Sequence, residues 1–328
     1  MSGVVGDTIV FVRKDSEVFT SRLDELIDDV AGVELWSNDK FCALTNIESI
    51  SVKEKMVRVH TCSGVIDCTS NYPLLKRSKK AASSIEHMKP DVTMLAHHSI
   101  DLLIKAFCTL PDEIDCPDAF ALGAFISFGS CCPLTAESGA DWVIEHEKEE
   151  FLREVQSCLK FPTVVHSPLP GSTRCQLKLL TDERPIVAYF RETLYNKHGE
   201  MRVPKCIMNA SRQVVERFWN GLMPFGRLIT SFAKTHGTYP ARGKQLAADI
   251  WILAHRVGLH VVLYETLTSE TPNLTSFELH CLWLKSRYDP DQLRYIYEIP
   301  NDQTLYRITL EKVERMSIGP GNLLIPTN

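Results

Sequence analysis

Residues 117–129 read PDAFALGAFISFG and predict a helix that is apolar on nearly every side. Such a helix is buried or packs against another like it. A candidate partner lies about a hundred residues later, where residues 211–226 read SRQVVERFWNGLMPFG, with Ser211 as a good N-cap. Each helix has a central glycine, Gly123 or Gly221, which costs about 1 kcal/mol relative to Ala. That cost is acceptable where two helices approach closely, so we expect them to pair.

Both helices end in the dipeptide Phe-Gly. Each is followed by a mixture of strand-like and polar residues and then by a more regular helix. After the second apolar helix, this regular helix lies near residues 243–258. This order predicts a duplicated unit, paired through its first helices into an α+β domain with pseudo-twofold symmetry. The expected helix-pair interface consists of Gly123, Phe128, Gly129, Gly221, Phe225 and Gly226.

The two ends of the chain read as β structure, because short β-rich runs recur over the first 75 residues and again over the last fifty. We therefore predict an α+β fold in which an all-β domain is formed by residues 1–110 and 286–328. The α+β domain, residues 111–285, is inserted between them. The basic cluster Lys76, Arg77, Lys79 and Lys80 begins a polar stretch, which we interpret as a solvated connector, with nucleic-acid contact as the alternative.

Composition limits the classes of function. The net charge is −5, and residues 1–115 carry 13 basic and 18 acidic side chains against 23 of each in the remainder. A protein that mainly binds duplex DNA usually has a surplus of Lys and Arg, so DNA is a disfavoured partner. No apolar run is long enough to span a membrane, and the N-terminus lacks the features of a secretion signal.

The eleven cysteines include no Cys-x-x-Cys pair, and the His97-His98 pair has no partner at metal-ligand spacing. We expect reduced thiols in a cytoplasmic, reducing compartment, and no metal ion or cofactor.

Several motifs resemble the inteins of large-DNA-virus B-family DNA polymerases, in which a self-splicing Hint domain is split by a LAGLIDADG homing endonuclease. Residues 6–10 (GDTIV) are similar to the start of the Hint domain, and residues 64–75 (GVIDCTSNYPLL) to its second block. Residues 321–328 (GNLLIPTN) are similar to its closing block, and the two apolar helices to the paired LAGLIDADG helices. The resemblance implies a Hint-like β domain with a LAGLIDADG-like insertion.

The resemblance also implies a splicing site whose groups are largely missing here. Gly3 stands where the family has its Cys or Ser nucleophile, and Tyr72 stands where the family has a His. A phenol with a pKa near 10 cannot shuttle protons at neutral pH. The penultimate His of the family is Thr327 in this sequence, and Asn328 is retained as the last residue. We therefore expect no splicing.

The nuclease site that the resemblance implies is degenerate as well. In active LAGLIDADG enzymes each paired helix ends in an acidic residue before Gly, and the two carboxylates bind catalytic divalent cations. The equivalent residues here are Phe128 and Phe225. The alternative interpretation of both rings is ordinary core packing. Either way we expect no enzyme activity, because Phe has no oxygen that could bind a metal ion.

Three hypotheses follow. The first is a catalytically inactive intein-like scaffold that binds protein partners or itself, including a role in a virion or its assembly. The second is a DNA-binding remnant that no longer cleaves. The third is a nuclease that uses other residues.

Overall fold

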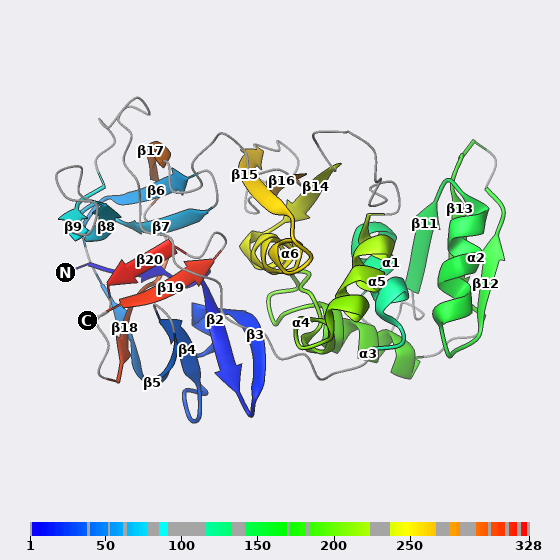
Figure 1. The fold of residues 1–328 in the computed structure, drawn as a ribbon, viewed down its shortest axis with the longest axis horizontal. Coiled ribbons are helices and arrows are strands. Elements are labelled where there is room, and N and C mark those ends of the chain that lie inside the picture. The colour runs from blue at the N-terminus through cyan, green and yellow to red at the C-terminus, as the bar shows by residue number, and fades with distance from the viewer. Residues whose placement is uncertain are drawn as a thin grey trace. The chain divides into compact units, whose positions relative to one another are not determined.

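The computed structural model places part of the chain, and the description below is limited to that part: residues 2–37, 40–51, 53–61, 64–77, 85–90, 116–132, 142–168, 171–180, 184–223, 237–266, 276–282, 293–300, 303–311, 315–319 and 323–326. The fold is a mixture of helices and mostly antiparallel sheets, which confirms the predicted α+β class (Figure 1). The chain divides into two compact units, Pro111–Gly237 on the one hand and Met1–Leu110 with Thr238–Asn328 on the other.

The unit that contains both chain ends is built on an 11-stranded sheet. Its N-terminal strands are β1 (Val4–Val5), β2 (Ile9–Lys14), β3 (Glu17–Arg22), β4 (Glu34–Ser37), β5 (Lys40–Ile50), β6 (Met56–Thr61) and β7 (Val65–Thr69). Its C-terminal strands are β17 (Leu293–Ile299), β18 (Leu305–Leu310), β19 (Arg315–Gly319) and β20 (Leu323–Pro326). The order is β17-β6-β7-β1-β18-β5-β4-β2-β19-β20, with β3 paired to β2.

Strands from the N-terminal and C-terminal parts of the chain are interleaved in this sheet. Val4 of β1 pairs with Cys68 of β7 on one side and with Tyr306 of β18 on the other. The apolar core has the same mixed origin, because Val10 and Ile308 belong to one buried cluster. The N-terminal strands, blue in Figure 1, and the C-terminal strands, red in Figure 1, therefore share one sheet and one apolar core.

Strand β5 is one continuous strand, although the sequence reads as two separate β-rich runs at residues 41–44 and 47–52. It is continuous because it has two successive partners. Its first part pairs with β4, from Lys40 to Ala43, and its second part pairs with β18, from Leu44 to Ile50. The polar residues in between stay in the strand, and the Thr45 hydroxyl donates to the Thr309 carbonyl at 2.9 Å.

The prediction of a solvated connector is wrong for Lys76 and Arg77, the first two residues of the basic cluster. Lys76 and Arg77 belong to β8 (Leu74–Arg77), which forms a two-stranded sheet with β9 (Ile85–Met88). The register places Lys76 opposite Glu86, so backbone pairing continues to the end of β8. Lys79 and Lys80 lie outside the described residues.

The same unit includes a three-stranded sheet with the order β14 (Gly237–Arg242), β16 (Ser276–Leu282) and β15 (His260–Thr266), and helix α6 (Lys244–Arg256), which packs on it. Gly243, with φ of 86°, makes the turn from β14 into α6. Helix α6 also packs on β2 and β3, where Gln245 donates to Thr20 and Thr20 donates to Asp249. The compact unit containing the chain ends resumes at residue 238. The predicted domain boundary at residue 285 lies outside the described residues.

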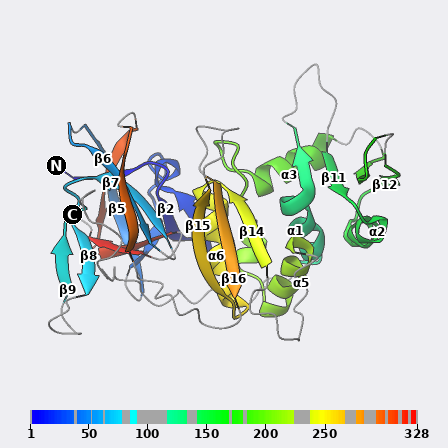
Figure 2. The ribbon, with the colours of Figure 1, turned by 90° about the horizontal axis from the view of Figure 1, so that it is seen from above.

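The other unit has a four-stranded sheet in the order β10-β11-β13-β12 and five helices (Figure 2). Its strands are β10 (Gly129–Cys131), β11 (Trp142–His146), β12 (Thr163–His166) and β13 (Cys175–Leu179). Its helices are α1 (Ala119–Phe128), α2 (Glu149–Cys158), α3 (Arg184–Leu194), α4 (Lys205–Met208) and α5 (Arg212–Leu222). The remaining helical element of the described chain is the 3-10 helix η1 (Leu23–Glu25). No helix among the described residues is long and apolar enough to cross a membrane.

Helices α1 and α5 pack directly against each other, and their two central glycines lie at the contact. A Cβ atom on Gly123 would collide with the backbone of α5 at Phe218 and Leu222. A Cβ atom on Gly221 would collide with the backbone of α1 at Phe120 and Ala124. Because the obstacle is backbone in both cases, no side-chain movement can relieve the collision.

We predict that Gly221→Ala destabilises the protein by about 1–3 kcal/mol, because the added methyl group forces the two helices apart. Alanine is otherwise the better helix former by about 1 kcal/mol, so the sign of the change is diagnostic. The measurement is the urea midpoint followed by circular dichroism. Asn220→Ala, at the exposed neighbouring position of α5, is the matched control and should leave the midpoint unchanged or raise it slightly. A midpoint for Gly221→Ala as high as that of the control would refute the close helix contact.

Candidate functional site

The structure brings Gly3 and Tyr72 to the same place through Thr69, at the end of β7. The Gly3 amide donates to the Thr69 hydroxyl at 3.2 Å, and the Thr69 amide donates to the Gly3 carbonyl at 3.1 Å. The Tyr72 amide donates to the Thr69 carbonyl at 2.9 Å. Gly3 and the TSNY segment thus form one hydrogen-bonded corner.

At Gly3 and Tyr72 this corner holds no side chain that could act as a nucleophile or a proton shuttle at neutral pH. Gly3 has no side chain, and a Cβ atom there would lie 2.6 Å from Ile50 Cδ1 and 3.0 Å from the Tyr306 carbonyl oxygen. Tyr72 is buried, and burial, together with Cys68, raises the pKa of its phenol far above the usual value. The hydroxyl therefore stays protonated.

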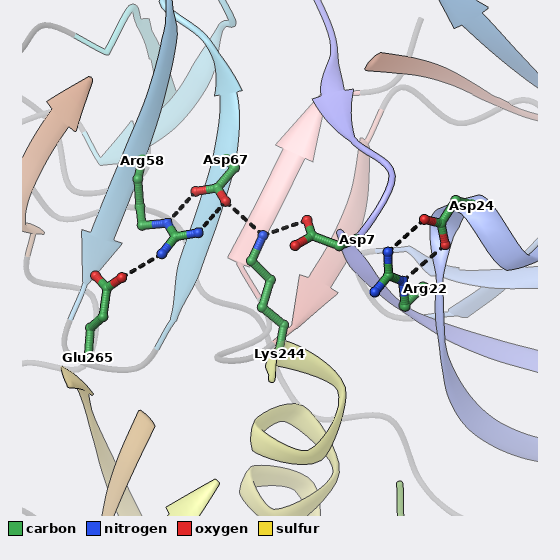
Figure 3. Close-up of polar contacts among 7 residues, drawn as sticks. All are labelled: Asp7, Arg22, Asp24, Arg58, Asp67, Lys244 and Glu265. Carbon is green, nitrogen blue, oxygen red and sulfur yellow. Dashed lines mark hydrogen bonds and ion pairs between the residues drawn. The ribbon is translucent and has the colours of Figure 1, made fainter. Parts of the chain in front are cut away.

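A cluster of charged side chains is buried between the large sheet and helix α6 (Figure 3). At its centre, Asp67 of β7 accepts two hydrogen bonds from Arg58 of β6, both at 2.6 Å, and one from Lys244 Nζ at 2.8 Å. Lys244, the first residue of α6, also donates to Asp7 at 2.6 Å. Arg58 reaches Glu265 of β15 at 2.5 Å. We call these five residues the buried ion cluster.

Charge compensation keeps Asp67, Arg58 and Lys244 ionised. Burial alone would raise the pKa of Asp67, but Lys244 and Arg58 outweigh it and hold the pKa well below the usual value. Burial likewise opposes the charge of Lys244, while Asp67 and Asp7 raise its pKa above the ordinary value. On the far side, the Tyr297 hydroxyl donates to both oxygens of Glu265, at 2.9 and 2.8 Å. The pKa of that phenol is raised by burial.

Sequence reasoning missed this cluster, since its members come from segments that are far apart along the chain. A signal was nevertheless present. Arg58 in β6 and Asp67 in β7 each interrupt a run of apolar residues, and a charge within a buried strand must have a partner. The position of that partner, Lys244, does not follow from such a pattern.

Phe128, the last residue of α1, lies in an aromatic group at the sheet of the second unit. Its ring meets His146 of β11 edge-on at 4.9 Å between centroids, and Phe151 of α2 at 5.7 Å. The ring centroids of His146 and Phe151 are 4.3 Å apart. Burial lowers the pKa of the His146 imidazole. The end of α1 therefore presents apolar rings, and Gly129 behind it sits directly against Phe125.

Several predicted positions cannot be compared in this way. Phe225 and Gly226 lie outside the described residues, as does Asn328. Within the described ranges no group of three or more His, Cys, Asp or Glu side chains could hold a metal ion.

One face of the four-stranded sheet is covered by helices, because Trp142 packs on Phe125 of α1 and Phe190 of α3, and His146 packs on Phe151 of α2. The opposite face, which we call the open sheet face, carries Ser130, Val143, Glu145, Val164, His166, Gln176 and Lys178. Its one Lys is balanced by its one Glu, and Gln176 donates to that carboxylate at 2.5 Å. Over these described strand positions the open sheet face therefore has no surplus of basic residues.

The chain is weakly similar to solved structures. The structure described as "The crystal structure of I-DmoI in complex with DNA and Mn", a LAGLIDADG homing endonuclease, aligns with 50% of this chain and 88% of its own length. The sequence identity is 16% and the TM-score is 0.28. No family model matches the chain, and no curated protein does.

We predict that Asp67→Asn lowers the free energy of unfolding by about 3–5 kcal/mol, because it leaves the buried Lys244 and Arg58 without their shared counter-charge. The folded-state pKa of Asp67 is depressed, so its contribution to stability is fully present above the unfolded-state pKa, about 3.9, and is lost as the pH falls below it. The difference in the free energy of unfolding between wild type and Asp67→Asn should therefore be smaller at pH 3 than at pH 7. Urea midpoints at the two pH values measure it.

The matched control is Glu298→Gln, which breaks the exposed ion pair between Glu298 and Lys55 at 2.7 Å. Exposed pairs contribute little, so the control should shift the midpoint by less than about 1 kcal/mol. Equal effects of the two substitutions at pH 7 would show that the cluster does not stabilise the fold.

Proposed function

We propose that this protein is a catalytically inactive, intein-like and homing-endonuclease-like chain that works through its surfaces, as a structural or protein-binding subunit. The observation that carries the proposal is the packing of Phe128. Its ring occupies the end of α1, against His146 and Phe151, where a metal-dependent nuclease of this design needs a carboxylate.

A divalent cation that activates water needs oxygen ligands, and a phenyl ring has none. The aromatic group around Phe128 also makes the end of the helix apolar, and His146 is held in its neutral form by burial. Restoring a carboxylate at residue 128 would place a charge against the rings of His146 and Phe151, which is unfavourable without a partner. These contacts support loss of nuclease chemistry rather than its relocation within this site.

The corner around Gly3 supports loss of splicing chemistry in the same way. The backbone hydrogen bonds between Gly3 and Thr69 persist, while the nucleophile is absent and the Tyr72 phenol remains protonated. A side chain at residue 3 would also have to displace Ile50. The scaffold that would hold a splicing junction is thus kept without its reactive groups.

The alternative, a DNA-binding remnant, is the less favoured proposal. Phosphate contacts require a local surplus of Lys and Arg. The open sheet face has balanced charge, and the whole chain has a net charge of −5. A face of this kind suits a protein partner better than a duplex. The resemblance of the sequence to inteins of large DNA viruses extends the proposal to a component of a virion or of its assembly.

We predict that the purified protein does not nick or cut supercoiled plasmid with Mg²⁺ or Mn²⁺. The double variant Phe128→Asp/Phe225→Asp tests whether the carboxylates alone are missing, and we expect no cleavage from it either, because the described positions of the open sheet face have no surplus of basic residues. Agarose gels measure the outcome. A mock preparation from cells that do not express the protein, purified identically, controls for contaminating nuclease. Cleavage by wild type that exceeds this control and requires the metal ion would contradict the proposal.

The surface role predicts stoichiometric protein contacts. Light scattering should show self-association of the 37.1 kDa chain, or quantitative mass spectrometry of cross-linked native material should show one partner at a fixed ratio. In parallel, a gel-shift series at low salt should show no duplex binding. A monomer with no fixed-ratio partner, or duplex binding that weakens steeply with salt, would favour the DNA-binding alternative.

A further inference from the structure

Two cysteines that are distant in the sequence meet in the second unit, and neither belongs to the sites described above. Cys116 lies in the turn that enters α1, where its carbonyl accepts from the Ala119 amide at 3.1 Å. Cys206 is the second residue of α4, shortly before α5. Their Sγ atoms are 3.3 Å apart. A disulfide has an S–S bond of about 2.05 Å, so closure requires a relative movement of the two sulfur atoms of only about 1.2 Å.

The two thiols have different environments. Cys206 is partly exposed, whereas Cys116 is buried. The hydrogen bond between the two thiols lowers the pKa of Cys206, against the effect of burial, and the backbone amides of Ile207 and Cys206 act in the same direction. The pKa of Cys116 is raised by that same hydrogen bond and by burial. Cys206 is therefore the thiol that an oxidant in solution meets first and the one that more readily becomes a thiolate.

We propose that Cys116 and Cys206 form a redox-active pair, in which Cys206 reacts with a small disulfide such as glutathione disulfide and Cys116 completes an intramolecular disulfide. In the first step the Cys206 thiolate attacks one sulfur of glutathione disulfide and releases one glutathione thiolate. In the second step Cys116 loses its proton and attacks the Cys206 sulfur, which releases the second glutathione. Two protein thiols are oxidised, and one glutathione disulfide is reduced to two glutathione molecules.

The bond would fasten the entry of α1 to the segment that leads into α5. These are the two helices whose backbones are in contact at Gly123 and Gly221, so oxidation would lock the helix pair at its beginning. The chain enclosed between the cysteines is long, about 90 residues, and the unfolded state would lose correspondingly more entropy. We expect the oxidised protein to unfold at a temperature about 5 °C or more above the reduced protein.

The test uses the purified full chain, reduced and then exposed to glutathione disulfide at neutral pH. Differential alkylation and peptide mapping should identify a Cys116–Cys206 disulfide, with no glutathione retained on either residue. Cys116→Ser should instead retain glutathione on Cys206, because the resolving thiol is missing. Cys206→Ser should leave Cys116 unreacted. Cys132→Ser removes an exposed cysteine and should behave as wild type in forming the bond.

Two results would overturn the proposal: absence of the Cys116–Cys206 peptide under conditions that modify Cys132, or equally fast reaction of Cys116 in the Cys206→Ser variant. If either serine variant fails to fold, pulse alkylation of reduced wild type decides the matter. Cys158 is also partly exposed, but burial raises its pKa, so Cys206 should be labelled first at pH 7. Faster labelling of Cys158 would remove the basis for a reactive Cys206.

Discussion

A carboxylate that has no contact with water, that of Asp67, stays charged only because Arg58 and Lys244 both hold it. These three groups come from two strands of the large sheet and from the start of α6, and Glu265 adds a strand of the small sheet. Moving α6 away would strand at least two buried charges, at a cost of several kcal/mol. The helix and its sheet are therefore bound to the strands of the chain ends by electrostatics as well as by apolar contact.

The second unit depends on a different constraint, the approach of two backbones. Gly123 and Gly221 permit α1 and α5 to touch along their main chains, so each helix buries surface that side chains would otherwise hold apart. The rings around Phe128 then close the end of the helix pair with apolar material. No charged group of the kind seen around Asp67 takes part in these contacts. Specificity here comes from shape.

The periodicity of the sequence predicts what is local. The apolar stretches at residues 117–129 and 211–226 became α1 and α5, and residues 243–258 contain α6. Sequence patterns did not predict the structure where a partner far away in the sequence determines it. Strand β5 is continuous because β18 pairs with its second half, and Lys76 lies in a strand because of β9. The buried ion cluster and the Cys116–Cys206 contact are likewise tertiary, because nothing near Asp67 or Cys206 in the sequence names the partner.

The position of β1 has a consequence for synthesis of the protein. This two-residue strand lies between β7 and β18. Its hydrogen bonds to β18 therefore cannot form until residues 305–306 have been synthesised. A ribosome that has made the first hundred residues has therefore produced strands without their neighbours, and unpaired strand edges invite wrong association. The residues 111–237, whose contacts are largely their own, can collapse in the meantime. Assembly of the chain-end unit is thus a late event, and the nascent N-terminal segment has the greater need of a chaperone.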